Sequence, residues 1–170
     1  MITSKLDEKD LAILTLIQEN SKLTANQIAK KIGAPITTVF AKTKRMEEMG
    51  IIKQYRAVLD PEKLNLGTSA FILAQVSYRA MKNDDETPIT QRDVAEEIAR
   101  LPEVQEVHII TGDWDLLVKL RAENVDAVGK FVVDNLRRIK GLEKTLTCMV
   151  FATIKETTSL PQIKRAQPKV

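Results

Sequence analysis

The sequence predicts an α+β fold in two parts: three short helices within residues 1–50, then a four-stranded antiparallel sheet with two helices within residues 67–156. Three observations support this prediction. Apolar residues recur at helical spacing before Gly50. Apolar, β-branched runs alternate with turn signals after residue 67. The order of these later segments is β-α-β-β-α-β, with residues 51–66 predicted as a hinge strand and linker and residues 157–170 as a basic tail, flexible or wrapped on a partner.

The first predicted helix runs from about Glu8 to Glu19 and begins after Asp7, whose carboxylate can cap the first turn. The second helix follows Thr24, a second capping residue, and ends at Gly33, which suits the positive φ of a helix C-terminus. Leu11, Leu14 and Ile17 of the first helix are expected to face inward, with Ile13 and Leu16 flanking them; Ile28, Ala29 and Ile32 form the inward side of the second.

The third helix is predicted from Ile36 to Met49, after the stop at Pro35 and before Gly50 as its C-cap. Its inward face holds Val39, Thr43 and Met46 at i, i+4 and i+7 spacing. The opposite face is rich in hydroxyl and basic side chains, with Lys42 at its edge; the candidate DNA-binding residues are Thr37, Thr38, Ala41, Lys42, Lys44 and Arg45.

Two helices joined by a tight turn, the second with a basic outer face, are typical of a helix-turn-helix that places one helix in the major groove of double-stranded DNA. Arg and Lys can reach phosphates or guanine, and Thr can offer a hydroxyl or touch a thymine methyl. A plain helical subdomain with a solvated basic face is the alternative. The capping residue Thr24, the small residue Ala29, the turn glycine Gly33 and the basic face occur in the order expected of a helix-turn-helix, which favours DNA binding. Residues Ile51–Leu59 alternate and predict a strand or wing.

The charge distribution supports this assignment. Residues 1–60 hold ten Lys or Arg against seven Asp or Glu, whereas residues 61–170 hold sixteen of each. The N-terminal part, the predicted DNA-binding head, therefore has a net charge of only +3, and a second copy of it is needed for useful affinity for DNA. Cys148, the only cysteine, excludes an intramolecular disulfide and is expected in a buried strand. With no signal peptide or apolar run of membrane-spanning length, the protein is expected to be cytoplasmic and to have no membrane partner.

The second part alternates strands and helices in a split βαβ order, which predicts a ferredoxin-like domain with both helices on one sheet face. The predicted segments are the strand Thr68–Tyr78, covered on both faces; a loop over residues 81–88; the helix Ile89–Leu101; the hairpin strands Val104–Thr111 and Trp114–Arg121; the helix Val125–Ile139; and the strand Leu142–Lys155. The face without helices would be apolar and open. A second copy related by two-fold symmetry is its simplest partner, so we expect a homodimer.

The hairpin turn at Gly112-Asp113 leaves two interpretations open. Gly112 lets a ligand approach the backbone, Asp113 or Asp115 could pair with an α-ammonium group, and Trp114 could form a wall, which together suit a free amino acid. Alternatively the turn is only a tight turn, with Trp114 in a core or interface. A metal site at the two aspartates is not expected, because no His or Cys cluster supports it. No catalytic residue is expected either, since the sequence shows no nucleophile or phosphate-binding loop. His108 is expected to be a packed or rim residue.

Five segments together resemble the Lrp/AsnC family of feast/famine transcription regulators: LDEKDLAIL at Leu6–Leu14, TANQIAKKIG at Thr24–Gly33, the run at Lys44–Leu64, LPEV at Leu101–Val104 and TGDWDLLVKL at Thr111–Leu120. The resemblance implies a winged-type head, a hinge, and a C-terminal domain for effector binding and oligomerisation, with dimers that assemble further, often to octamers. It implies an amino-acid effector, no cofactor and no enzymatic activity, with effector-binding candidates Thr111, Gly112, Asp113, Trp114, Asp115, Thr145 and Thr147.

Two other functions stay open. Some relatives of this family decarboxylate tetrapyrroles, but such a site needs several His and Arg residues and this chain has one His. A ligand-independent architectural protein that bends DNA is the second alternative. The chain also departs from the family pattern: Pro35 replaces a common serine and could shift the helix start, Ala41 replaces a common arginine, and the loop Arg79–Asp93 is longer than usual.

Overall fold

The computed structural model describes residues 6–77, 79–80 and 87–161 of the 170-residue chain. They belong to two compact units. The first comprises the chain up to Val58 together with the segment from Lys155 onward, and the second runs from Leu59 to Ile154. The C-terminal segment therefore returns to the N-terminal unit, which the sequence did not indicate.

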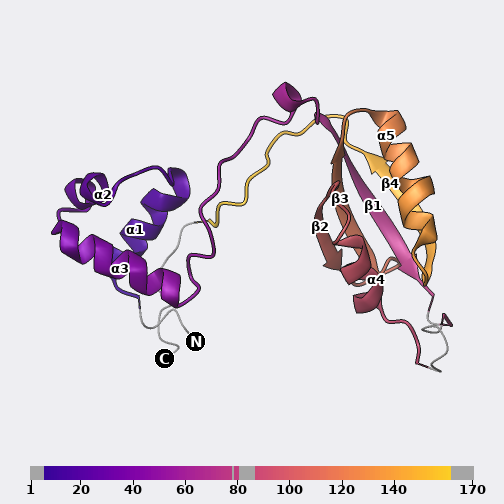
Figure 1. Ribbon diagram of the computed structural model, residues 1–170, viewed down its shortest axis with the longest axis horizontal. Coiled ribbons are helices and arrows are strands. Elements are labelled where there is room, and N and C mark those ends of the chain that lie inside the picture. The colour runs from indigo at the N-terminus through magenta and orange to yellow at the C-terminus, as the bar shows by residue number, and fades with distance from the viewer. Residues whose placement is uncertain (1–5, 78, 81–86, 162–170) are drawn as a thin grey trace. The chain divides into compact units, whose positions relative to one another are not determined.

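Three helices form the N-terminal unit: α1 (Glu8–Glu19), α2 (Ala25–Ile32) and α3 (Ile36–Glu48) (Figure 1). Three of the predicted caps are confirmed, and one is wrong, because the C-cap of α3 is Met49 and the predicted Gly50 follows it with φ 68°. Asp7 and Thr24 each close a reciprocal capping box with the residue three positions later, and Gly33 ends α2 at φ 62°. Although Pro35 has no hydroxyl with which to cap α3, the helix still begins at Ile36, because proline's fixed φ is compatible with the residue that precedes a first turn.

The core of this unit corrects the predicted inward face of α1. Ile13, expected at the flank, is fully buried beside Val39 and Met46, whereas Leu11 and Ile17 are only partly buried. The reason is that the inward face of α1 also contains a charged residue, Asp10, which is buried. Because the prediction counted only apolar residues as buried, it did not place Asp10 on the inward face and therefore rotated that face toward Leu11.

Residues Ile51–Leu59 do not form the predicted strand: the chain bends after α3 and then continues without regular structure. Within the described chain no second strand is available to pair with its backbone groups. One side chain does hold the start of this segment, since the hydroxyl of Tyr55 donates a 2.7 Å hydrogen bond to Glu47 at the end of α3. Burial and this carboxylate raise the pKa of Tyr55 to about 12.

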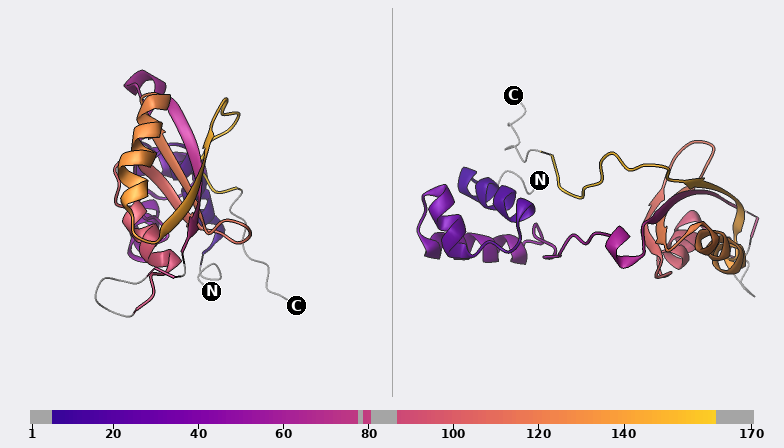
Figure 2. Two further views of the ribbon diagram at one scale, coloured as in Figure 1. Left: turned by 90° about the vertical axis from the view of Figure 1, so that its right-hand side faces the viewer. Right: turned by 90° about the horizontal axis from the view of Figure 1, so that it is seen from above.

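The second unit begins with a short 3₁₀ turn (Glu62–Leu64) and has the predicted ferredoxin-like topology. Its antiparallel sheet has the order β2-β3-β1-β4, and α4 and α5 lie on one side of it (Figure 2). The bounds are β1 Thr68–Val76, α4 Gln91–Ile98, β2 Val104–Ile109, β3 Leu116–Ala122, α5 Val125–Lys130 and β4 Leu142–Met149. After α5 the chain stays helical, as a π segment (Phe131–Asn135) and a 3₁₀ turn (Leu136–Arg138).

The core of the second unit lies between the sheet and the helices. Ala70, Ile72 and Ala74 of β1 pack there with β3 and with Val128, Phe131 and Leu136. The prediction that β1 is largely covered on both faces holds fully for one face of the single chain, since Phe71, Leu73 and Gln75 on the other face are only partly buried.

Two further expectations about strands are corrected. Cys148 is exposed, because it lies opposite Phe71 and therefore on the sheet face that no helix covers. The last strand ends at Met149 rather than Lys155, since the residues beyond it have no strand to pair with in the described chain. The predicted end of β1 at Tyr78 and most of the loop over residues 81–88 lie outside the described residues.

Candidate DNA-binding and effector-binding sites

The outer face of α3 carries the candidate DNA-binding residues. Val39 and Met46 are fully buried and fix the helix from behind, while Thr37, Ala41 and Lys44 on the opposite side are exposed. Thr38 is partly buried at the margin of this face. Helix α3 therefore presents a hydroxyl-bearing and basic surface to solvent.

Two large apolar side chains on α3 were not among the candidates. Phe40 is 66% exposed and Ile36 is 50% exposed. The sequence offered a signal for Phe40, which does not fall on the face defined by Val39 and Met46; Ile36 lies three residues before Val39, nearer to that face, and is exposed as the first residue of α3.

A carboxylate cluster at the start of α1 binds two of the predicted DNA-contacting side chains. The side chain of Asp10 is 0% exposed and accepts a 2.7 Å hydrogen bond from Nη2 of Arg45 and a 3.1 Å hydrogen bond from Nζ of Lys42. Asp7 also accepts from Nζ of Lys42. Its own N–H donates to Asp10 at 2.8 Å. The cluster therefore joins α1 to the middle of α3.

This cluster separates the roles of Lys42 and Arg45. The Lys42 side chain is 17% exposed and its ammonium is bound by two carboxylates, whereas Arg45 is 46% exposed and keeps part of its guanidinium at the surface. The hydrogen bond from Lys42 holds the pKa of Asp7 at about 2, well below its ordinary value of 3.8. Burial opposes the charge of Lys42, but its hydrogen bonds to Asp7 and Asp10 outweigh burial and raise its pKa.

The C-terminal segment contacts the same unit near the end of α1. The side-chain amide of Gln18 donates to the carbonyl of Leu160, and the N–H of Leu160 donates back to Gln18, both at 2.9 Å. Nη2 of Arg56 donates to the hydroxyl of Thr158 at 2.9 Å. Residues 157–161 of the predicted tail therefore lie on the chain's own N-terminal unit, and residues 162–170 lie outside the described residues.

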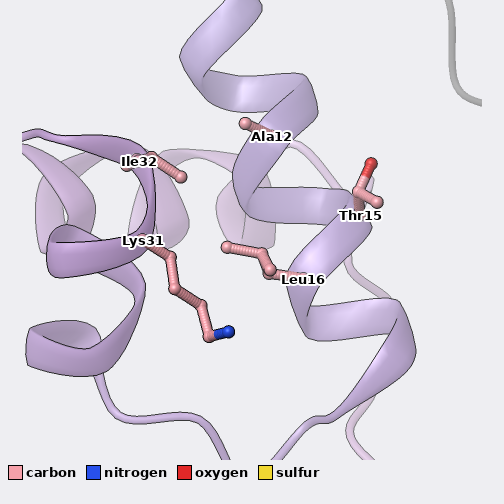
Figure 3. Close-up of a pocket in the computed structure, with 5 residues that line it drawn as sticks. All are labelled: Ala12, Thr15, Leu16, Lys31 and Ile32. Atoms are coloured by element: carbon pink, nitrogen blue, oxygen red, sulfur yellow. The ribbon is translucent and has the colours of Figure 1, made fainter.

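Each unit has an open cavity among its described residues, and the residues of the Gly112-Asp113 hairpin turn line neither of these two cavities. A cavity of about 460 Å³ opens between α1 and α2, where Figure 3 shows Lys31 extending beside Leu16 and Ile32. A second cavity, of about 370 Å³, lies between α4 and β2 and is lined in part by Arg92, Glu96 and His108.

At the hairpin, Asp115 has a structural role in joining three elements. Its carboxylate accepts hydrogen bonds from the N–H of Val76 at 2.8 Å and from Nε2 of Gln91 at 2.6 Å. Its own N–H donates to the carbonyl of Ala74 at 3.0 Å. Asp115 thus ties the start of β3 to the end of β1 and to the first residue of α4, and its carboxylate is already engaged.

The rest of the turn is open. Thr111, Gly112 (φ 116°) and Asp113 are exposed, and within the described chain no donor reaches the Asp113 carboxylate. The Asp113 carbonyl accepts a 2.7 Å hydrogen bond from Gln75. Trp114 is partly buried, and Nζ of Lys144 lies 5.4 Å from the centre of its ring, a cation–π contact that the sequence did not indicate.

The remaining candidates, Thr145 and Thr147, lie on a different face of the sheet. They are opposite Ala74 and Ile72 and therefore share the helix-covered side. Lys144, which contacts Trp114, is opposite Gln75 and belongs to the other face. The single chain thus groups Asp113, Trp114 and Lys144 but does not bring the two threonines to them.

Other site classes receive no support from the geometry. Among the residues that the structure describes, no group of three or more His, Cys, Asp or Glu side chains is placed to hold a metal ion. In the same part of the chain, no helix combines the length and apolar character needed to cross a membrane.

Comparisons with known proteins match both parts of the chain. Residues 6–53 match a family model for winged helix-turn-helix DNA-binding domains, and residues 78–160 match one for the Lrp/AsnC ligand binding domain. The chain is 43% identical over 151 residues to the uncharacterized HTH-type transcriptional regulator PH1916 of Pyrococcus horikoshii, covering 89% of this chain and 96% of that protein. It is 36% identical to the HTH-type transcriptional regulator FL11 of the same organism, covering 92% and 96%.

The fold agrees with a solved structure of similar size. The crystal structure of transcriptional regulator NMB0573 from Neisseria meningitidis, in complex with L-Met, superimposes with a TM-score of 0.81 at 32% identity, covering 92% of this chain and 97% of that one. Sequence, topology and helix-turn-helix geometry thus lead to one assignment. The chain belongs to the Lrp/AsnC family of HTH-type transcriptional regulators.

Proposed function

We propose that the protein regulates transcription by placing α3 in the major groove of an operator. The single observation that carries this proposal is the two-sidedness of α3: Val39 and Met46 are fully buried, while Thr37 and Lys44 face solvent. Such a helix can lie in the groove without disturbing its own core. Thr37, Thr38, Ala41, Lys44 and Arg45 form the proposed contact surface.

Lys42 and Arg45, the two basic candidates that contact Asp10, have different roles. Lys42 is bound by Asp7 and Asp10, so we assign it to positioning α3 rather than to reading bases. Arg45 gives one nitrogen to Asp10 but has five N–H donors in a fixed fork. Its remaining donors can reach a phosphate or a guanine, and Asp10 restricts the directions in which they point.

The proposed regulator acts as a homodimer or a higher assembly such as an octamer. The sheet face without helices presents Phe71, Leu73 and Leu146, apolar side chains that water would otherwise cover. A second copy of the same chain covers such a face symmetrically and supplies a second head. Two heads on one operator compensate for the modest positive charge of each.

The effector we propose is a free amino acid at the hairpin turn. Asp113 has a carboxylate available for an α-ammonium group, the turn around Gly112 can offer N–H groups to a carboxylate, and Trp114 can cover an apolar side chain. The match to a ligand binding domain and the L-Met complex of the meningococcal regulator support this choice. Thr111 begins the turn and can contribute, whereas Thr145 and Thr147 lie on the helix-covered side of the sheet and are left out of the proposed site.

Fluorescence anisotropy with labelled duplexes tests the DNA part of the proposal. A site selected from a random-sequence library should bind more tightly than random DNA, and both affinities should fall with added salt. Equal affinity for selected and random duplexes at every salt concentration would contradict sequence-specific regulation.

A thermal-shift screen with the twenty amino acids tests the effector separately. Stabilisation by one or a few of them, lost in Asp113→Ala, is the expected result. No shift at millimolar concentration would favour the ligand-independent architectural protein instead.

A further inference from the structure

Phe40 is an exposed aromatic residue on a helix that otherwise presents polar groups to solvent. Its side chain is 66% exposed, and Ile36, one helical turn before it, is 50% exposed. Residues at i and i+4 lie side by side on a helix surface. The two side chains therefore form one apolar strip along the first two turns of α3.

Phe40 does not contribute to the core of its own unit. The core residues of α3 are Val39 and Met46, and Phe40 is absent from the apolar cluster that they belong to. Among the described residues, no ring contact involves Phe40. Truncating this side chain therefore costs the folded unit little, and the exposed strip formed by Phe40 and Ile36 is free to contact a partner.

The partner that fits this strip is the DNA that the polar residues of α3 are proposed to bind. Phe40 lies three residues after Thr37 and four before Lys44, so all three share one side of the helix. The first turns of a recognition helix are the part that meets base edges. A neutral protein partner on this strip would also have to cover Thr37 and the ammonium of Lys44, which DNA can satisfy with bases and phosphates.

We propose that Phe40, supported by Ile36, is a specificity-determining residue that selects thymine by covering its 5-methyl group in the major groove. A phenyl ring has no hydrogen-bonding group, so it can distinguish base pairs only by apolar contact, and the thymine methyl is the apolar group displayed there. This inference rests on the proposed DNA-binding function. It adds that part of the operator sequence is selected by contact area rather than by hydrogen bonds.

The test removes the methyl groups from the DNA without changing its base pairing. The probe is the tightest-binding duplex selected from a random library by the full-length protein. Uracil replaces thymine at one position at a time, in both half-sites, and affinity is measured by fluorescence anisotropy. We expect a loss of roughly fourfold for each methyl group that Phe40 covers, by the usual value for burying one carbon, and therefore roughly tenfold or more for two half-sites.

Variants make the test specific to Phe40. Phe40→Ser should bind the thymine duplex more weakly and should no longer distinguish thymine from uracil. Phe40→Leu, which keeps an apolar side chain, should retain part of the discrimination. Val133→Ala, in which a comparably exposed apolar residue of the second unit is shortened, is the matched control and should behave like the unsubstituted protein.

Three outcomes would overturn the inference while leaving DNA binding intact. Uracil could be tolerated at every position, the loss on uracil substitution could persist in Phe40→Ser, or Phe40→Ser could change the size of the assembly in light scattering, which would assign the strip to contacts between protein chains. If no duplex is bound better than random DNA, the proposed function itself fails. The two failures are therefore distinguishable.

Discussion

Replacing Asp10 with Asn should loosen the attachment of the recognition helix to α1. The substitution keeps the size of the side chain and removes its charge. In the folded protein the Asp10 carboxylate is 0% exposed and accepts from Arg45, from Lys42 and from the N–H of Asp7, at 2.7, 3.1 and 2.8 Å. An asparagine has one acceptor oxygen, and its amide group would donate toward a cation.

The expected loss follows from these contacts. A hydrogen bond to a charged group contributes about 1.5–3 kcal/mol, so the two cationic donors set an upper limit of about 3–6 kcal/mol. Two features reduce that limit. Arg45 is 46% exposed, so water can replace part of its contact, and Lys42 retains Asp7. We therefore expect a loss of about 2 kcal/mol in the local stability of the N-terminal unit.

Hydrogen–deuterium exchange measures this loss on the full-length protein. Peptides that cover residues 8–19 and 36–48 should exchange about 30-fold faster in Asp10→Asn, and peptides of the second unit should not change. Asp126→Asn is a matched control, because Asp126 forms a 2.8 Å ion pair with Lys130 in which both side chains are exposed. Exchange in Asp10→Asn that is no faster than in this control would refute the role assigned to the buried carboxylate.

Three further predictions concern other residues of the two sites. Because the pKa of Asp7 is lowered from 3.8 to about 2 on folding, its contribution to stability is complete above about pH 5 and is lost as the pH falls through 3.8 toward 2; acid unfolding followed by circular dichroism should lose this component in Asp7→Asn. Arg45→Ala should weaken operator binding in gel shifts by about 1–3 kcal/mol and relax the preference at one base position, and unchanged affinity would remove Arg45 from the interface. Asp115→Ala should destabilise the second unit by about 1–3 kcal/mol in thermal unfolding, because it removes the acceptor of the partly buried donors of Val76 and Gln91, while Asp113→Ala should unfold like the unsubstituted protein; equal melting temperatures for the two would contradict this division of roles.

Local sequence signals predicted the elements of this protein because those elements depend on neighbours in the chain. The capping carboxylate of Asp7, the hydroxyl of Thr24 and the positive φ of Gly33 act within one helical turn, and all three were correct. The βαββαβ order was equally accessible, since it needs only the sequence of apolar runs and turns. The Gly112-Asp113 turn was recognisable for the same reason.

The sites themselves depended on contacts that no local pattern contains. Asp10 meets Lys42 and Arg45 across 32 and 35 positions of the chain, and this contact decides which basic side chain of α3 remains at the surface. Strand register likewise decides on which face of the sheet Thr145 and Thr147 lie, because a shift of one residue moves every side chain to the other face.

By itself, then, the sequence determined the helices of the first unit, the βαββαβ order of the second and the family to which the chain belongs, but it wrongly predicted a strand at Ile51–Leu59. The tertiary structure alone decided that Asp10 is a buried anchor, that Asp115 is a joint between elements, and that Phe40 is left exposed. The physical reason is range: capping and turn formation act within about four residues, whereas burial and ion pairing are set by whichever distant segment the fold brings into contact.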